Sequence, residues 1–324
     1  MTDYNIKSDL YTMRPNASVN SINQYASTLT KLYSYIYEGK MISLEWVADL
    51  DIIEQVEQFL DTYSAPTKRN YLNSIIVALK GLNEYDEDLL KTYETLRDTY
   101  HQEYLASQSQ LTPKQKENWA AWKDIVKVVT RYKDSLTTVL TDKPEEIHPS
   151  EYKTFNDYVL LLLYTKLPPI RNDFGNVRII KHDNFATLEK KHKSGLNLLV
   201  VRDNIPQFLV LNEYKTHKTY GEVQIPLPEE VKTVVTVWLK YNKSGYLLVG
   251  GRSKSQPLGS NGISVRLRAI FKKYLNKNIS TNMLRHIYVS ERYSTTVDAM
   301  KKDANDMLHD EMTQKKIYVK TYDH

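Results

Sequence analysis

The hydrophobic pattern of this chain is helical over most of its length and is interrupted once by short strand-like segments. Before residue 166 and after residue 228, apolar residues recur at the spacing of amphipathic helices. Between these regions, three short runs are rich in Val, Leu and Ile and are bounded by turn residues, namely 197–202, 207–212 and 221–226. The pattern predicts a mainly α protein with a small antiparallel β-sheet, of the α+β class.

The helical segments fall into two groups separated by a polar stretch. The first group predicts a small helical domain over residues 1–105, with helices at 17–38, 47–63, 66–82 and 86–105. The stretch ASQSQLTPKQKEN is polar and contains Pro113, so residues 106–118 are predicted to be a linker. Residues 119–324 form the second predicted domain, with further helices at 119–132, 150–165, 229–241, 264–275, 282–293, 297–308 and 312–319.

The composition excludes several kinds of protein. The chain has no cysteine, which rules out disulfides, iron–sulfur clusters, thiolate zinc sites and cysteine nucleophiles. It has no apolar window of about 18 residues, the length needed to span a bilayer, and its N-terminal residues lack the apolar core of a secretory signal. We therefore expect a soluble, intracellular protein with no membrane-spanning segment.

The net charge of +5 is unevenly distributed along the chain. Residues 1–110 carry 9 Lys and Arg against 16 Asp and Glu, whereas residues 111–324 carry 35 against 23. A basic second domain suggests a polyanionic partner, with nucleic acid as the first choice and an anionic membrane surface as the second. In the acidic first domain, Lys68, Arg69 and Lys80 are candidate DNA contacts on one helix, and we expect the carboxylates to be turned away from them.

The second domain contains an ordered set of residues that carry chemistry. Arg171 follows a Pro-Pro stop, Lys215 lies in the turn between two predicted strands, and Arg285 begins a predicted helix in TNMLRHIYVS. His309 and Tyr318 follow, nine residues apart, in DMLHDEMTQKKIYVK. Each fragment alone is common in proteins, but the complete set in this order and at these spacings is difficult to obtain by chance.

These motifs resemble the tyrosine recombinase, or phage-integrase, superfamily. The family's second box has the form H-x-L-R-H, where this chain has T-N-M-L-R-H, and its third box is matched by M-L-H-D-E-M-T-Q-K-K-I-Y. The motifs cover about residues 115–324, while residues 1–105 match a helical DNA-clamping domain in size and character only. The Pro-Pro-x-Arg box is similar in style to those of viral and mobile-element recombinases.

The resemblance implies site-specific cleavage and rejoining of double-stranded DNA through a 3′-phosphotyrosine. Tyr318 is then the nucleophile, and a homo-tetramer assembles on paired DNA sites from a protein that is monomeric in free solution. The implied catalytic residues that act on the scissile phosphate or on the leaving group are Arg171, Lys215, Asn282, Arg285 and His309.

The chemistry of the residues agrees with this assignment. Attack of a tyrosine oxygen on a phosphodiester builds negative charge on the non-bridging oxygens, which two arginines can bind bidentately. A lysine on a mobile connection can protonate the 5′-oxygen that leaves. This mechanism needs neither a metal ion nor another cofactor.

Two positions depart from the family pattern, and the choice of the catalytic lysine stays open. Asn282 occupies the place of a histidine, where it can donate a hydrogen bond but cannot transfer protons. Phe174 occupies the place of an acidic residue, for which Asp173 is a candidate substitute. Lys218 is an alternative to Lys215 as the catalytic lysine and a further candidate DNA contact.

Two alternative functions remain. The first is a type IB DNA topoisomerase, although the 24 residues from Arg285 to His309 match the compact recombinase spacing. The second is a catalytically weakened DNA-binding protein on the same scaffold, which the loss of the histidine at position 282 favours.

Overall fold

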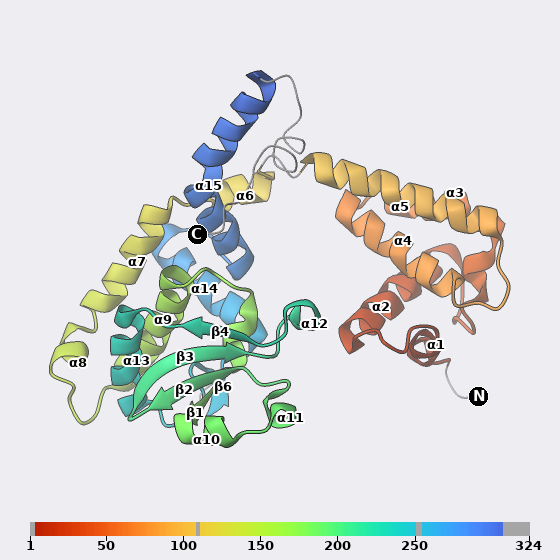
Figure 1. Cartoon of the computed structure of the whole chain (residues 1–324). Coiled ribbons are helices and arrows are strands. Elements are labelled where there is room, and N and C mark those ends of the chain that lie inside the picture. Colours follow the sequence, from red (N-terminus) through yellow and green to blue (C-terminus); the bar gives the residue numbers. More distant parts are fainter. Residues whose placement is uncertain (1–3, 108–110, 251–254, 307–324) are drawn as a thin grey trace. The chain divides into compact units, whose positions relative to one another are not determined.

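The computed structural model describes residues 4–107, 111–250 and 255–306. The chain forms two compact units, Met1–Leu111 and Thr112–His324 (Figure 1). Helices predominate, and they are accompanied by a small four-stranded sheet and a two-stranded sheet. The mainly helical α+β class predicted from the hydrophobic pattern is therefore confirmed. Within the described ranges, no helix is both long enough and apolar enough to cross a bilayer.

The first unit is a helical bundle in which α4 packs against α2 and α5. The predicted helices 17–38, 66–82 and 86–105 are confirmed to within a few residues, while 47–63 begins as 3-10 turns. The core contains the fully buried side chains of Leu29, Leu72 and Tyr93. The elements of this unit are α1 (Ile6–Met13), α2 (Val19–Ile36), η1 (Glu45–Ala48), η2 (Leu50–Ile52), α3 (Ile53–Leu60), α4 (Ala65–Leu79) and α5 (Glu87–Ser107).

The segment predicted to be a linker is largely helical. Helix α5 continues to Ser107, and α6 (Pro113–Asn118) begins at a capping box, in which Thr112 and Gln115 satisfy each other's backbone N–H groups. Asn118 is buried, and its Oδ1 accepts a hydrogen bond of 2.7 Å from the backbone of Asn278. Local capping thus outweighs the polar composition of 106–118, and α6 belongs to the second unit.

The second unit is built around α9 (Pro149–Lys166), whose residues from Phe155 to Tyr164 are all buried. This helix contacts α7 (Trp122–Asp134), α13 (Glu229–Tyr241) and α14 (Ser260–Leu275). These helices share one apolar core with α9. Short helices connect the larger elements, namely α8 (Thr137–Thr141), α10 (His182–Thr187), α11 (Lys190–Lys193) and α12 (His217–Tyr220).

The main sheet has the strand order β1-β2-β3-β4 and is mixed. The three predicted strands are present as β2 (Leu198–Arg202), β3 (Ile205–Leu211) and β4 (Val223–Pro226), and they pair antiparallel. The expectation of a purely antiparallel sheet is wrong, because β1 (Arg178–Lys181) adds a parallel edge to β2. Its four residues, two of them charged, are too short a run to be recognised by alternation alone. A separate two-stranded sheet pairs β5 (Val249–Gly250) with β6 (Gln256–Pro257).

The sheet separates two apolar regions. Leu199, Val201 and Leu209 point into the main core, whereas Leu198, Val200 and Val210 pack with Phe185 of α10 on the opposite face. Alternate residues of a strand point to opposite faces, so these runs of buried residues fit a sheet covered on both sides.

The last described element is one long helix, α15 (Thr281–Asp306). Two helices were predicted there, at 282–293 and 297–308. Residues 294–296 are Ser-Thr-Thr, with neither Gly nor Pro to end the first helix, so the backbone continues as one. The predicted helix 312–319 lies outside the described residues.

A buried ion pair joins α9 to α14. Asp157 is 5% exposed, and its carboxylate accepts hydrogen bonds from Arg266 Nε and, at 2.7 Å, from Arg266 Nη2. Burial raises the pKa of the Asp157 carboxyl, and the hydrogen bonds from Arg266 oppose this rise. Removing one partner leaves the other charge without compensation in the core.

We expect Arg266→Ala to lower the free energy of unfolding by about 3–5 kcal/mol, because it leaves the Asp157 carboxylate buried and unpaired. Urea denaturation measures this loss. The double variant Asp157→Leu with Arg266→Met removes both charges and should recover most of the stability. A single variant as stable as the wild-type chain would contradict this account.

Candidate functional site

The beginning of α15 presents polar side chains to a pocket of about 350 Å³. Met283, Leu284 and Ile287 of this helix are buried in the core, so the intervening positions point outward. Asn282 and Arg285 are three residues apart and therefore share one helix face, which His286 extends. The pocket is lined by Pro168, Pro169, Asn282, Arg285, His286, Tyr288, Val289 and Ser290.

Arg171 is held beside this pocket by the end of α9. Pro168 and Pro169 follow the helix, and Arg171 then precedes the 3-10 helix η3 (Asn172–Asn176). The buried hydroxyl of Tyr164 donates a 2.5 Å hydrogen bond to the carbonyl oxygen of Arg171. The backbone of Arg171 is thus anchored in the core, while its side chain is exposed.

The pKa of the Asp173 carboxyl depends on its burial and on the charges around it. Burial raises its pKa, the charges of Arg171 and Arg285 act to lower it, and the charge of Glu213 acts to raise it. The guanidinium groups of Arg171 and Arg285 therefore lie within electrostatic reach of one carboxyl. Phe174, in the place of the family's acidic residue, is buried and packs edge-on against Tyr164, with ring centroids 5.3 Å apart.

Asn172 ties the segment that carries Arg171 to the helix that carries Arg285. Its Oδ1 accepts hydrogen bonds from Thr281 Oγ1 at 2.7 Å and from Ser264 Oγ at 3.1 Å. Thr281 is the first residue of α15, one position before Asn282 and four before Arg285. The two arginine-bearing segments, distant in sequence, are thus joined by direct side-chain hydrogen bonds.

Asn197 ties the same segment to the connection that carries Lys215. It is 4% exposed, and its Nδ2 donates to the carbonyl oxygens of Asp173 at 3.0 Å and Glu213 at 2.9 Å. Its Oδ1 accepts from the backbone N–H groups of Asn212 at 2.9 Å and Glu213 at 2.8 Å. The start of the lysine-bearing connection is therefore fixed to η3.

The connection between β3 and β4 is longer than the predicted turn. It contains α12, because Tyr214 Oη donates to Gly221 O at 2.7 Å and the backbone N–H of Gly221 donates to His217 O at 2.7 Å. Lys215 precedes this helix and Lys218 lies within it, and both side chains are exposed. Lys215 is two residues from Glu213, the residue that Asn197 holds on both backbone atoms.

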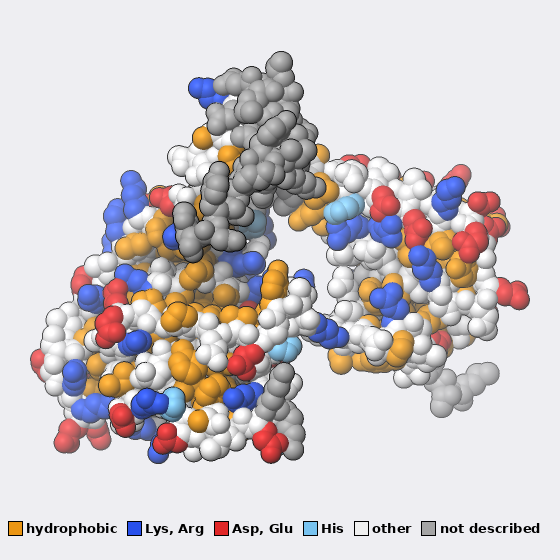
Figure 2. Space-filling model, viewed as in Figure 1, with side chains coloured by type: hydrophobic (Ala, Val, Ile, Leu, Met, Phe, Trp, Pro, Cys, Tyr) orange, Lys and Arg blue, Asp and Glu red, His pale blue; other side chains and the backbone are white. Residues whose placement is uncertain are grey.

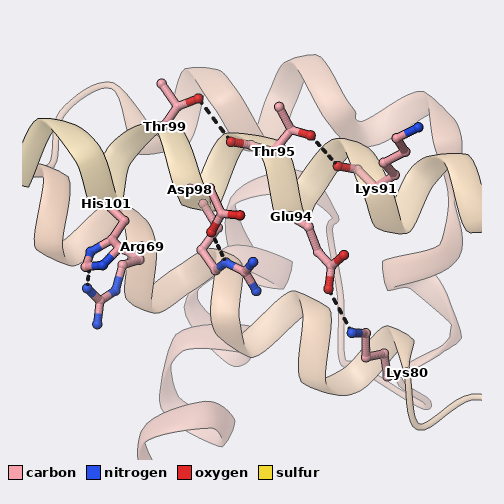
Figure 3. A network of polar contacts seen from close by, with 9 residues as sticks. Arg69, Lys80, Lys91, Glu94, Thr95, Asp98, Thr99 and His101 are labelled. Atoms are coloured by element: carbon pink, nitrogen blue, oxygen red, sulfur yellow. Dashed lines mark hydrogen bonds and ion pairs between the residues drawn. The ribbon is translucent and has the colours of Figure 1, made fainter.

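In the first unit, the three candidate DNA contacts all lie against α5. Arg69 and Lys80 are eleven residues apart, close to three helical turns, and both turn toward α5 in Figure 3. Arg69 Nη1 lies 2.7 Å from His101 Nδ1, and Lys80 Nζ lies 2.7 Å from Glu94 Oε1. Lys68 Nζ is 4.7 Å from the centroid of the Tyr100 ring.

The expectation that carboxylates are turned away from these cations is wrong for two residues. Glu94 pairs with Lys80, and Asp61 Oδ1 lies 3.5 Å from Lys68 Nζ. On the face of this unit seen in Figure 2, basic and acidic side chains are interspersed. Arg97 is likewise paired, because its Nε lies 2.8 Å from Asp98 Oδ1.

His309 and Tyr318 lie outside the described residues, so the structure places neither of them. In the described part of the chain, no group of three His, Asp or Glu side chains is arranged to hold a metal ion. Comparison of the chain with protein-family models, curated proteins and solved structures finds no match. The resemblance to tyrosine recombinases therefore depends on the residues of this chain alone.

Asn172 and Asn197, which join the candidate catalytic segments, were not identified from the sequence. Asparagine in a loop is usually a turn residue, so the residue type carries no signal of its own. Asn172 stands next to Arg171, and that adjacency is the one hint the sequence contains. Asn197 acts on residues 15 and 16 positions later and on Asp173, 24 positions earlier, contacts that no local pattern predicts.

Asp173→Asn should become more stable relative to the wild-type chain as the pH rises. A raised pKa in the folded state means that the carboxyl favours folding below its ordinary pKa of 3.8 and opposes it once the pH passes the raised value. Urea unfolding from about pH 4 to about pH 7 measures the difference. The exposed Asp134→Asn is the control, for which we expect a smaller dependence. A pH-independent difference for Asp173→Asn would contradict this interpretation.

Proposed function

We propose that this chain is a tyrosine-type site-specific DNA recombinase or integrase. One observation carries the proposal: hydrogen bonds of Asn172 and Asn197 join the Arg171 segment to the helix that carries Arg285, more than a hundred residues away in sequence, and to the connection that carries Lys215. The order of the motifs and the pairing of two arginines with a lysine support strand transfer on a phosphodiester. The proposal assigns Arg171, Arg285 and Asn282 to the scissile phosphate, together with His309.

In the proposed reaction, the Tyr318 oxygen forms a bond to phosphorus, and the bond from phosphorus to the 5′-oxygen breaks. The tyrosine gives up its proton to water as it attacks, and Lys215 supplies a proton to the 5′-oxygen as it leaves. The arginines bind the non-bridging oxygens, on which negative charge builds. The product is a 3′-phosphotyrosine, and attack by a 5′-hydroxyl reverses the steps to rejoin DNA.

The charge pattern of the second unit supports a nucleic-acid partner. From residue 231 to residue 290 the sequence contains no Asp or Glu and eleven Lys and Arg. This stretch runs from α13 through α14 to the pocket face of α15. Such one-signed regions bind phosphate backbones by releasing condensed counterions.

The partners proposed with this function are two DNA duplexes and three further copies of the chain. Recombination between two duplexes breaks four strands, so four active sites act together in a homo-tetramer on paired sites. Without DNA, the protein is proposed to be a monomer. Its proposed place of action is inside the cell, wherever its target DNA lies.

We expect the wild-type chain to form a covalent adduct with nicked duplexes, and Tyr318→Phe to form none. The probe is a library of nicked oligonucleotide duplexes with a randomised core, in which the strand released by cleavage diffuses away. Denaturing gels reveal the adducts, and sequencing identifies the preferred site. Arg171→Ala and Arg285→Ala should each lower the rate by about 10²–10³, because each removes a donor to the developing oxyanion.

Two matched variants control this experiment. Tyr322→Phe changes a tyrosine four residues after Tyr318, and Arg202→Ala removes an exposed arginine at the far end of β2. Both should react at the wild-type rate. An adduct that persists in Tyr318→Phe but is lost in Tyr322→Phe would identify Tyr322 as the nucleophile. DNA binding by the wild-type chain without any adduct would indicate a DNA-binding protein that has lost catalysis. Relaxation of supercoiled plasmid without strand exchange would identify a type IB topoisomerase.

Lys80→Ala should weaken DNA binding and reduce the salt dependence of the affinity. Lys80 lines a pocket of about 420 Å³ together with Arg14, Arg97 and Asn73. Loss of one phosphate contact should lower the slope of log affinity against log salt by about 1. Lys91→Ala is the control, because Lys91 points away from α4 in Figure 3. Equal slopes for both variants would exclude the α4–α5 face as a DNA contact.

A further inference from the structure

We infer that Asn197 is a positioning residue for the leaving-group proton, and that it acts through the segment 212–215. This inference rests on the proposed function. Lys215 is exposed on a connection whose start, at Asn212 and Glu213, is held by Asn197. Asn197 holds that anchor against the segment that carries Arg171, so it sets the place from which the lysine reaches the 5′-oxygen.

The hydrogen bonds of Asn197 use the full capacity of its amide. A side-chain amide has two N–H donors and an oxygen with two lone pairs. Here the donors go to Asp173 O and Glu213 O, and the lone pairs accept from Asn212 and Glu213. The backbone is held as well, because Asn197 O accepts a 2.8 Å hydrogen bond from Arg178 N. A buried group satisfied in this way has one orientation and resists displacement.

The position of this amide explains why it affects the lysine and not the arginines. Asn172, the first residue of η3, independently ties the Arg171 segment to Thr281 at the start of α15. Loss of Asn197 therefore leaves the two arginine segments joined but frees the connection from η3. Lys218 is less affected, because it lies inside α12, whose backbone is closed by the hydrogen bond from Gly221 N to His217 O.

Asn197→Asp is the sharpest variant. It keeps the shape and the accepting oxygen but turns the donor into an oxygen that faces the carbonyls of Asp173 and Glu213. The matched control is Asn156→Asp. Asn156 is also buried, and its amide bridges the backbone N–H and C=O of Val249. Asn197→Thr, which keeps one donor and one acceptor, should show a smaller defect and is available if Asn197→Asp does not fold.

The experiment compares two substrates of the sequence selected from the random library. One is ordinary DNA, and in the other the 5′-bridging oxygen at the cleaved phosphate is replaced by sulfur. When the bond from phosphorus to sulfur breaks, the sulfur leaves as a thiolate, whose conjugate acid has a pKa of about 8.5, so it needs no proton. A defect in proton donation is therefore rescued by sulfur, whereas a defect in binding the oxyanion is not.

We expect Asn197→Asp to cleave ordinary DNA at least about 10-fold more slowly than wild type and the sulfur substrate at nearly the wild-type rate, as Lys215→Ala does. Arg285→Ala should be slow on both substrates, and Asn156→Asp should change both rates equally. A loss in Asn197→Asp that sulfur does not rescue, or no loss at all, would overturn the positioning role while leaving the recombinase proposal intact. Failure of the wild-type chain to form any adduct would overturn both.

Discussion

Helix α9 is buried on every side from Phe155 to Tyr164, and the elements of the second unit cover this stretch. A helix that is apolar on every side has no face for solvent, so α7, α13, α14 and the sheet must surround it. The single carboxylate inside this core, Asp157, requires the guanidinium of Arg266. The end of α9 is also the start of the candidate site, since Tyr164 anchors Arg171 from within the core.

The candidate site is assembled by neutral amides. Asn172 and Asn197 flank Asp173 in sequence or in space and bind, respectively, the start of α15 and the connection after β3. Neutral hydrogen bonds can align cationic segments without neutralising them, whereas carboxylate partners would cancel the charge that an anionic substrate requires. The exposed side chain of Arg171 and the half-buried side chain of Arg285 therefore remain available, while hydrogen bonds of Asn172 and Tyr164 anchor the segments that carry them.

The two units differ in their net charge and in how their Lys and Arg side chains are paired. In the first, the cations of α4 meet an imidazole and carboxylates at α5, so its surface is mixed. In the second, residues 231–290 contain no carboxylate of their own, and carboxylates from outside this stretch, Asp157 and Glu229, pair with Arg266 and Lys232. The surplus of Lys and Arg over Asp and Glu in residues 111–324, 35 against 23, gives the second unit a net positive charge, whereas the first is net negative.

The sequence by itself determined the helical class, the position of the sheet and the ordered set of arginines and lysine, because these depend on local periodicity and on residue type. Helix α13 matches its predicted bounds for this reason. The parallel strand β1, the capped helix α6 and the uninterrupted α15 depend on pairing, capping or continuation that hydrophobic patterning does not record. Only the tertiary structure joined the Arg171 segment to the helix that carries Arg285, through Asn172, and to the connection that carries Lys215, through Asn197. These hydrogen bonds link residues far apart in sequence, which no local pattern records.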